Sequence, residues 1–292
     1  MDIQEFSSGI ADAVERGAAG VVTVNGRKRQ TASGIVWRAD LVVTADHVVQ
    51  RDDHLSIVSA DGTEHAAELA GRDGNSDIAM LRVPAASLTP ATFASIEPRV
   101  GQIVLAVGRP NTIQASLGII NAIGGPVRMR RGTLEQYLRT DATPYPGFSG
   151  GALVNVAGEV VGLFTSGLAG GEPVAIPAAV LAGVAENLLT HGRMRRGFLG
   201  IGTQTIALPA NQRAGRTQEQ GLLLVNVEEN SPASQGGLLV GDILVGLDGQ
   251  ILSDPGDLQD LLSGNRVGQT ISAEVIRGNQ LHTLSVTVGE RK

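Results

Sequence analysis

The stretch 147-GFSGGALVN-155 places a serine between glycines, and backbone N–H groups in a tight turn of this kind converge on a developing oxyanion. Gly147 carries no side chain that would block the approach to those N–H groups. Gly150 and Gly151 allow the chain to pass close behind Ser149. Taken alone, the stretch is explained equally well as a plain turn rich in glycine and serine.

Two further segments supply the residues that activate a serine. In 43-VTADHVV-49, His47 ends an apolar run and opens a short helical turn, and in 76-SDIAMLRV-83, Asp77 directly precedes a buried-looking strand. Each has a simpler explanation: His47 as a structural histidine and Asp77 as a cap at the edge of a strand. The three residues together favour a catalytic triad over these simpler explanations. Asp77 follows His47 by 30 residues and Ser149 follows Asp77 by 72, in the His…Asp…Ser order of one known triad arrangement.

Short β-type runs fill the chain from residue 19 to about residue 177, with turn signals such as 61-DG-62 and 73-DGN-75 between them. This density of short strands favours antiparallel barrels or a sandwich over a βαβ sheet. We expect His47 and Asp77 on a first barrel and Ser149 on a second. The runs include 20-GVVTV-24, 34-GIVW-37, 41-LVVTA-45, 55-LSIVSA-60, 78-IAMLRV-83, 103-IVLAVG-108, 117-LGIINAI-123 and 159-EVVGLFTS-166.

Helical patterns and a basic run divide the chain. Apolar residues at helical spacing predict an amphipathic helix near the start and another over 178–191, which Gly192 would end. After a basic linker, a small mixed domain follows, with Ser231 as a helix N-cap and a second helix near Asp254 or Pro255. We expect an N-terminal segment at 1–18, a barrel domain at 19–191, a linker at 192–196 and a second domain at 197–292.

Composition excludes several classes of protein. The chain has 292 residues, a net charge of −6, no cysteine and a hydrophobic content of 42%, so disulfides, thiolate metal clusters and a nucleic-acid surface are not expected. No phosphate-binding or dinucleotide-binding glycine motif is present, and the remaining histidines are scattered, so neither a cofactor nor a metal site is expected. The sequence as written carries no signal peptide or membrane span, which predicts a cytoplasmic protein, or an extracytoplasmic one if its N-terminus was trimmed.

The segments 44-TADHVV-49, 76-SDIAML-81 and 140-TDATPYPGFSGGALVN-155 together resemble the HtrA (Deg) family of trypsin-like proteases. The resemblance implies a mainly β fold, with a chymotrypsin/trypsin-like double β-barrel followed by a small α+β PDZ domain. The PDZ resemblance is carried by 231-SPASQGGLLVGDILVGLDGQ-250, which has Gly236 where the family pattern has alanine.

The resemblance also assigns roles. Ser149 would be the nucleophile, His47 the general base and Asp77 the group that orients the imidazole, with the N–H groups of Gly147 and Ser149 forming the oxyanion hole. In the second domain, 197-GFLGI-201 would bind a terminal carboxylate while a peptide adds as a strand. The peptide-binding residues are Phe198, Leu199, Gly200 and Ile201.

Two departures from the family pattern affect the site. Phe148 replaces the usual asparagine before the nucleophile and is expected to give the oxyanion loop a different resting shape. Asp46 is acidic where a neutral residue is common, but adjacent residues rarely orient one another, so Asp77 is kept as the orienting residue. The wall of the primary pocket is expected from 143–147 and 163–173, which favours a small or medium aliphatic residue before the cleaved bond.

The resemblance implies an ATP-independent serine endopeptidase of protein quality control that cleaves unfolded or damaged proteins. Its PDZ domain would bind C-terminal peptides to recruit substrate or regulate activity. The alternative is a chaperone-like or peptide-binding protein whose protease domain is latent, for which Phe148 is the argument. The family also implies a homotrimer built through the N-terminal segment, whose apolar face carries Ile3, Phe6, Ile10 and Val14.

Overall fold

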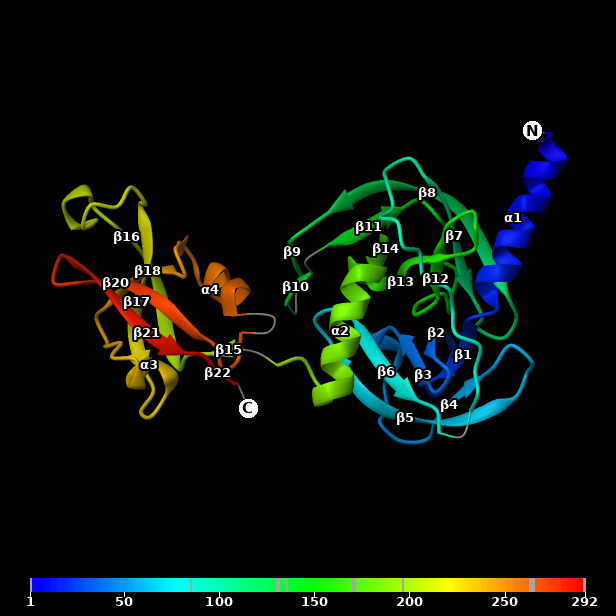
Figure 1. Ribbon diagram of the computed structural model, residues 1–292, viewed down its shortest axis with the longest axis horizontal. Helices are drawn as coiled ribbons and strands as arrows, with labels where there is room; N and C mark the ends of the chain where they lie inside the picture. The colour runs from blue at the N-terminus through cyan, green and yellow to red at the C-terminus, as the bar shows by residue number, and fades with distance from the viewer. Residues whose placement is uncertain are drawn as a thin grey trace. The chain divides into compact units, whose positions relative to one another are not determined.

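The computed structural model divides into two compact units, residues 1–194 and 195–292 (Figure 1). It describes residues 2–84, 86–129, 132–134, 136–169, 172–195, 197–262 and 266–290. Arg196 of the expected linker, and Gly170 and Gly171 of the expected pocket wall, lie outside these ranges. In the described part of the chain, no helix combines the length and the apolar character needed to cross a membrane.

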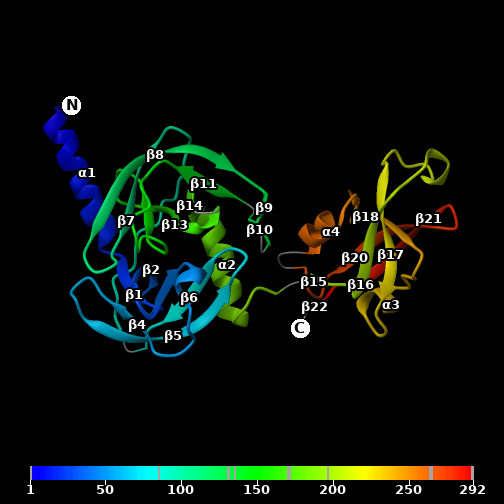
Figure 2. The same ribbon diagram turned by 180° about the vertical axis from the view of Figure 1, so that it is seen from behind.

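The first element is the helix α1 (Ile3–Ala18), which Asp2 and Glu5 cap by a reciprocal capping box. Only its C-terminal half is covered by the barrels: Ala13 is buried there, and Ile10 and Val14 pack against the same core. The N-terminal half projects away from the barrels (Figures 1 and 2), and Ile3 is 83% exposed.

The first barrel closes six antiparallel strands in the order β1-β2-β3-β6-β5-β4. Its strands are apolar on both faces where α2 or the second barrel covers them, which explains the continuous hydrophobic runs of β3 and β6. The strand over 64–73 was not expected from sequence, because its buried residues are sparse. The elements are β1 (Val21–Asn25), β2 (Ala32–Arg38), β3 (Leu41–Thr44), the 3-10 turn η1 (Asp46–Val48), β4 (Leu55–Val58), β5 (Glu64–Asp73) and β6 (Ile78–Arg82).

The second barrel also closes six strands, in the order β11-β14-β13-β12-β7-β8. The helix α2 (Ala178–His191) follows it and packs on β5, β6 and β13, and Gly192 ends the helix in the left-handed conformation with φ 70°. The strands are β7 (Ile103–Gly108), β8 (Gln114–Gly124), the hairpin pair β9 (Val127–Met129) and β10 (Gly132–Leu134), β11 (Tyr137–Thr140), β12 (Ala152–Val154), β13 (Val160–Ala169) and β14 (Glu172–Pro177).

The second unit is a sheet with strand order β16-β17-β18-β20-β21 and short helices, so the expected α+β class is confirmed. Ser231 caps α3 as expected and accepts a hydrogen bond from Ser234 N–H. Leu258 and Leu262 are buried in the core. The elements are β15 (Gly197–Phe198), β16 (Ile201–Ala207), η2 (Ala210–Gln212), β17 (Gln220–Val227), α3 (Pro232–Gln235), β18 (Ile243–Leu247), β19 (Gln250–Ile251), α4 (Pro255–Leu262), β20 (Thr270–Arg277), β21 (Gln280–Thr287) and β22 (Gly289–Glu290).

Candidate active site

His47 and Asp77 are held together at one end of the first barrel. His47 lies in η1, directly after β3, and Asp77 lies in the turn between β5 and β6. One Asp77 carboxylate oxygen accepts the backbone N–H of His47 at 2.9 Å, and the other lies 2.9 Å from His47 Nδ1. Asp77 holds this position with φ 55°, a left-handed conformation that is uncommon outside glycine. The carboxylate therefore fixes both the backbone and the ring of the histidine.

Ser149 reaches this pair from the second barrel, in the turn between β11 and β12. Gly150 follows it with φ 86°, and a Cβ there would lie 2.2 Å from both the carbonyl oxygen of Ser33 and Oγ1 of Thr44. Only glycine lets the serine turn pass this close to β2 and β3 of the first barrel. Ser149 is 8% exposed, at the seam between the barrels.

β13 was expected from sequence as part of the pocket wall, but its contacts with Asp77 and His47 were not. Thr165 Oγ1 donates a 2.6 Å hydrogen bond to the Asp77 carboxylate from a fully buried position. A Cβ on Gly167 would lie 2.5 Å from His47 Nδ1, so a side chain at this position would collide with the imidazole. Thr165 and Asp77 are 88 positions apart in the chain, so only the strand register of the closed barrel reveals their hydrogen bond.

The serine hydroxyl has a partner in β13. Ser149 Oγ lies 3.3 Å from Ser166 Oγ, and no hydrogen bond joins Ser149 to His47 in the part of the chain that the structure describes. The His47 side chain is 34% exposed, so it is open to solvent and to a substrate. Catalytic hydrogen bonds are often long or poorly aligned in the absence of substrate, so the missing bond does not argue against His47 as the base.

The turn before Ser149 offers two unused donors. Tyr145 to Phe148 form a type II turn with Gly147 at φ 88°, closed by the Phe148 N–H to the Tyr145 carbonyl at 3.1 Å. Among the residues that the structure describes, none accepts the N–H of Gly147 or of Ser149. These are the donors that an oxyanion needs.

Ser33 on β2 fixes this turn. Its hydroxyl donates to the Gly147 carbonyl at 2.8 Å, and its N–H donates to the Ser149 carbonyl at 3.2 Å. The same hydroxyl accepts the N–H of Arg109 at 2.8 Å. No local pattern marks Ser33 for this role, because it is one of many serines and only its complete burial distinguishes it.

Both departures from the expected pattern have a structural explanation. Phe148 is 1% exposed and packs edge-on against Tyr145 and Phe164, so it is a core residue of the second barrel. Asp46 is buried and forms a 2.6 Å ion pair with Arg72. Its carboxylate is thus engaged by the arginine.

Comparison with known proteins gives the family. Residues 32–163 match the trypsin-like peptidase domain and residues 197–288 match the PDZ domain. The structure of the HtrA-type protease AlgW with a tripeptide superimposes with a TM-score of 0.77 at 32% identity, covering 97% of each chain. The serine endoprotease from Yersinia pestis superimposes with a TM-score of 0.77 at 29% identity, covering 97% of this chain and 98% of that one. The chain belongs to the HtrA/DegP-like family of trypsin-like serine proteases.

Curated HtrA/DegP-like relatives are longer than this chain. A probable periplasmic serine endoprotease DegP-like from Halomonas elongata is 34% identical over 272 residues, which cover 90% of this chain and 57% of the relative. Its counterpart from Ectopseudomonas mendocina is 35% identical over 276 residues, with coverage of 90% and 58%. The chain therefore spans a little over half the length of these relatives.

The second unit of this HtrA-like chain has the loop expected to bind a carboxylate. Gly200 adopts φ 77°, and the carbonyls of Leu199 and Gly200 accept N–H groups from Ala233 and Glu228. Within the described ranges, the amide N–H groups of Leu199 and Gly200 themselves donate to no residue. Ile201 then starts β16, the strand at one end of the sheet. Phe198 belongs to β15, which pairs with β22.

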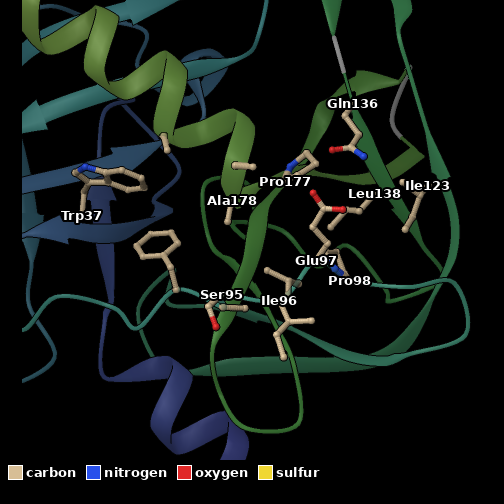
Figure 3. Close-up of a pocket in the computed structure, with 15 residues that line it drawn as sticks. Trp37, Ser95, Ile96, Glu97, Pro98, Ile123, Gln136, Leu138, Pro177 and Ala178 are labelled. Atoms are coloured by element: carbon tan, nitrogen blue, oxygen red, sulfur yellow. The ribbon is translucent and has the colours of Figure 1, made fainter.

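A cavity of about 520 Å³ is lined by residues other than the triad. Trp37 and Leu138 stand on opposite sides of it, with Pro177 and Ala178 at the start of α2 between them (Figure 3). Its lining is mostly apolar and includes none of His47, Asp77 and Ser149. Within the described residues, no group of three or more histidine, aspartate or glutamate side chains is arranged to hold a metal ion.

Proposed function

We propose that this chain is a serine endopeptidase in which Ser149 attacks the scissile carbonyl and His47 takes the serine proton. One observation carries the proposal: the Asp77 carboxylate contacts His47 Nδ1 at 2.9 Å, which leaves the opposite ring nitrogen as the base. Asp77 stabilises the imidazolium that forms, and His47 then returns the proton to the leaving amine. Thr165 holds the carboxylate for this task.

The oxyanion hole of the proposed mechanism is formed by the N–H groups of Gly147 and Ser149. Support comes from the lack of any acceptor for either group among the described residues, and from the hydrogen bond by which Ser33 holds the Gly147 carbonyl. Donors fixed in this way require no reorganisation when the tetrahedral intermediate forms. Removing one oxyanion-hole donor costs about 100-fold or more in rate in a serine protease of unrelated fold.

The proposed substrates are unfolded or damaged proteins, cleaved without ATP after a small or medium aliphatic residue. The pocket for that residue would be formed by 143–147 and 163–173, where no acidic side chain is expected at the base. We assign the protease domain to 19–191, the linker to 192–196 and the peptide-binding domain to 197–292. In this last domain, Phe198, Leu199, Gly200 and Ile201 would bind C-terminal peptides, which the free N–H groups of Leu199 and Gly200 support.

A second candidate is a chaperone-like or peptide-binding protein with a latent protease domain. The observation that favours it is that Ser149 Oγ contacts Ser166 Oγ at 3.3 Å and forms no hydrogen bond with His47 among the described residues. Phe148 gives this candidate no support, since its side chain is buried in the barrel core.

Digestion of unfolded casein by the purified chain, beside Ser149→Ala, separates the two candidates. We expect cleavage, and labelling by a fluorophosphonate probe, both of which Ser149→Ala abolishes. A chain that labels but cleaves only when peptides with free C-terminal carboxylates are added would be a protease regulated through its PDZ domain. A chain that neither labels nor cleaves, even with such peptides, would contradict the endopeptidase proposal.

We also propose that the chain forms homotrimers through its N-terminal helix. The projecting half of α1 carries Ile3, which is 83% exposed, and Phe6, which is half-buried, and exposed apolar side chains such as Ile3 are typical of subunit contacts. Light scattering should give the mass of three chains for the wild type and a lower mass for Phe6→Ser. A monomeric wild-type chain would contradict the proposal.

A further inference from the structure

A second hollow of about 460 Å³ lies in the first barrel, beside the connection between β1 and β2. One wall is that connection, and the other comes from the segment that follows η1. The hollow is basic, unlike the chain as a whole, whose net charge is −6. The lining residues that matter here are Arg27, Lys28, Arg29, Thr31, Arg51 and Glu64.

The positive charge of this hollow is not neutralised. Arg27, Lys28 and Arg29 form no ion pair with any residue that the structure describes, whereas arginines elsewhere, such as Arg72, are paired with carboxylates. The only acidic residue in the lining is Glu64, which accepts hydrogen bonds from the neutral side chains of the same wall. Four cationic side chains therefore share the hollow with one carboxylate.

Two of the arginines also have unused buried donors. In the described structure, Nε of Arg27 and Nε of Arg51 are buried and have no hydrogen-bond partner. Arg51 is nevertheless fixed, because its Nη2 donates to the Asn25 carbonyl at 3.1 Å. Burial lowers the pKa of Arg27, which shows that its guanidinium is partly desolvated.

The hollow adjoins the candidate active site. The Thr31 carbonyl lies 3.2 Å from the position of a Cβ on Gly147, so one end of the hollow touches the oxyanion turn. The other wall is tied to the histidine segment, because Gln50 N–H donates to the Gly26 carbonyl at 2.9 Å. A residue of the hollow's lining, Thr31, therefore contacts the oxyanion turn.

The side of the site on which the hollow lies identifies the part of a substrate that reaches it. β13 contacts Ser149 through Ser166 and carries the proposed pocket for the residue before the cleaved bond. The hollow lies next to Gly147 through a different strand, β2, and its preceding connection. A peptide that enters along β13 and crosses Ser149 therefore leaves toward Arg27 and Arg51.

We propose that this hollow is a subsite for an aspartate or glutamate side chain within the first three residues after the cleaved bond. The inference rests on the proposed endopeptidase function, because it needs a peptide that crosses Ser149. Guanidinium groups bind carboxylates through two parallel hydrogen bonds, and Arg27 and Arg51 line the hollow without a carboxylate partner among the described residues. Arg27 and Arg51 are the specificity-determining residues, and Lys28 and Arg29 add a favourable field.

The test uses quenched fluorescent peptides that differ only at the three positions after the cleaved bond, each position carrying aspartate, asparagine or lysine. All peptides are amidated at the C-terminus, so that the PDZ domain has no carboxylate to bind. We expect kcat/KM to be about tenfold higher for aspartate than for asparagine at one position, as a charge-assisted hydrogen bond predicts. The advantage should shrink when salt is raised from 0.05 M to 0.5 M.

Variants of the lining residues show which side chains produce the preference for aspartate. Arg27→Gln and Arg51→Gln should each remove most of the aspartate preference, whereas Arg38→Gln, at the far end of β2, should keep it. The rate of fluorophosphonate labelling should be the same in all four proteins, because the probe has no residue after a cleaved bond. Equal kcat/KM for aspartate and asparagine at all three positions, or equal losses in Arg38→Gln and Arg27→Gln, would overturn the proposal.

A binding measurement keeps the subsite testable if the endopeptidase proposal fails. The Ser149→Ala chain is titrated with the same amidated peptides, and binding is followed by fluorescence anisotropy. A preference for aspartate that disappears in Ser149→Ala/Arg27→Gln would support the subsite even without hydrolysis. Equal affinities for aspartate and asparagine peptides would refute the subsite, whatever the protease assay had given.

Discussion

The buried hydrogen bond from Thr165 to Asp77 gives the sharpest test of how the site is held. Thr165→Val keeps the shape of the side chain and removes the hydroxyl that donates to Asp77 at 2.6 Å. The same hydroxyl accepts the N–H of Gly167 at 3.0 Å, so two contacts near His47 are lost together. Because Thr165 is fully buried, water does not replace the missing donor.

The magnitude follows from the kind of bond. A buried hydrogen bond to a charged group contributes about 1.5–3 kcal/mol, and a unit of this size loses about 2–4 °C of melting temperature for each kcal/mol. We therefore expect the melting temperature of the protease unit to fall by about 3–12 °C. If the same energy is lost in the transition state, kcat/KM falls by about 10-fold to 100-fold.

Thr165→Ser is the matched control, because it keeps the hydroxyl and removes only a methyl group. Calorimetry and peptide hydrolysis would be measured on the wild type and both variants at pH 7. The reasoning is refuted if Thr165→Val is as stable and as active as Thr165→Ser. A loss of stability without any loss of kcat/KM would show that the bond supports the fold and not the orientation of the imidazole.

Three further changes test other parts of the structure. Gly167→Ala should lower kcat/KM by about 100-fold or more, since the new methyl group displaces His47, while circular dichroism shows an intact fold. Ser166→Ala should raise the rate of fluorophosphonate labelling by about 2-fold to 10-fold, because it removes a neutral hydrogen bond of about 1 kcal/mol that competes with a bond from Ser149 to His47; a slower rate would contradict this. The hydrogen bond from the backbone N–H of Ser272 is the largest of the causes that lower the pKa of Asp248. The Asp248 carboxylate therefore stabilises the fold at pH values above its unfolded pKa of about 4. This stabilisation is lost as the pH falls through the lower pKa of the folded state. Hydrogen exchange in the full chain should therefore show Asp248→Asn destabilising the second unit at pH 7 and having a smaller effect below pH 4; a constant difference would contradict this.

Local patterns in the sequence predicted the elements that carry the site. The apolar runs before His47 and after Asp77 are β3 and β6, and the short helical turn expected at His47 is η1. The helix expected over 178–191 is α2, with Gly192 as its left-handed C-terminal cap. Each of these signals lies within about ten residues of chain, where spacing and turn chemistry determine the structure.

Contacts between the barrels could not be predicted in the same way. Ser33, Thr165 and Gly167 support the site through bonds or close approaches to residues far away in the chain, and nothing in their own neighbourhoods marks them. Phe148 was expected to alter the oxyanion loop, but its position in the core depends on Phe164 of a later strand. Such roles depend on strand register and barrel closure, which a local pattern does not specify.

The hydrogen bonds that cross the seam between the barrels have a consequence for how the molecule loses its activity. Asp77 is anchored by Thr165 of the other barrel, and the turn at Gly147 and Ser149 is anchored by Ser33 of the first. Neither barrel alone holds the proposed catalytic groups in place. We therefore expect a small separation of the two barrels to abolish activity before the chain unfolds. Mild heating should therefore give an inactive chain before it gives an unfolded one, instead of an active protease with altered specificity.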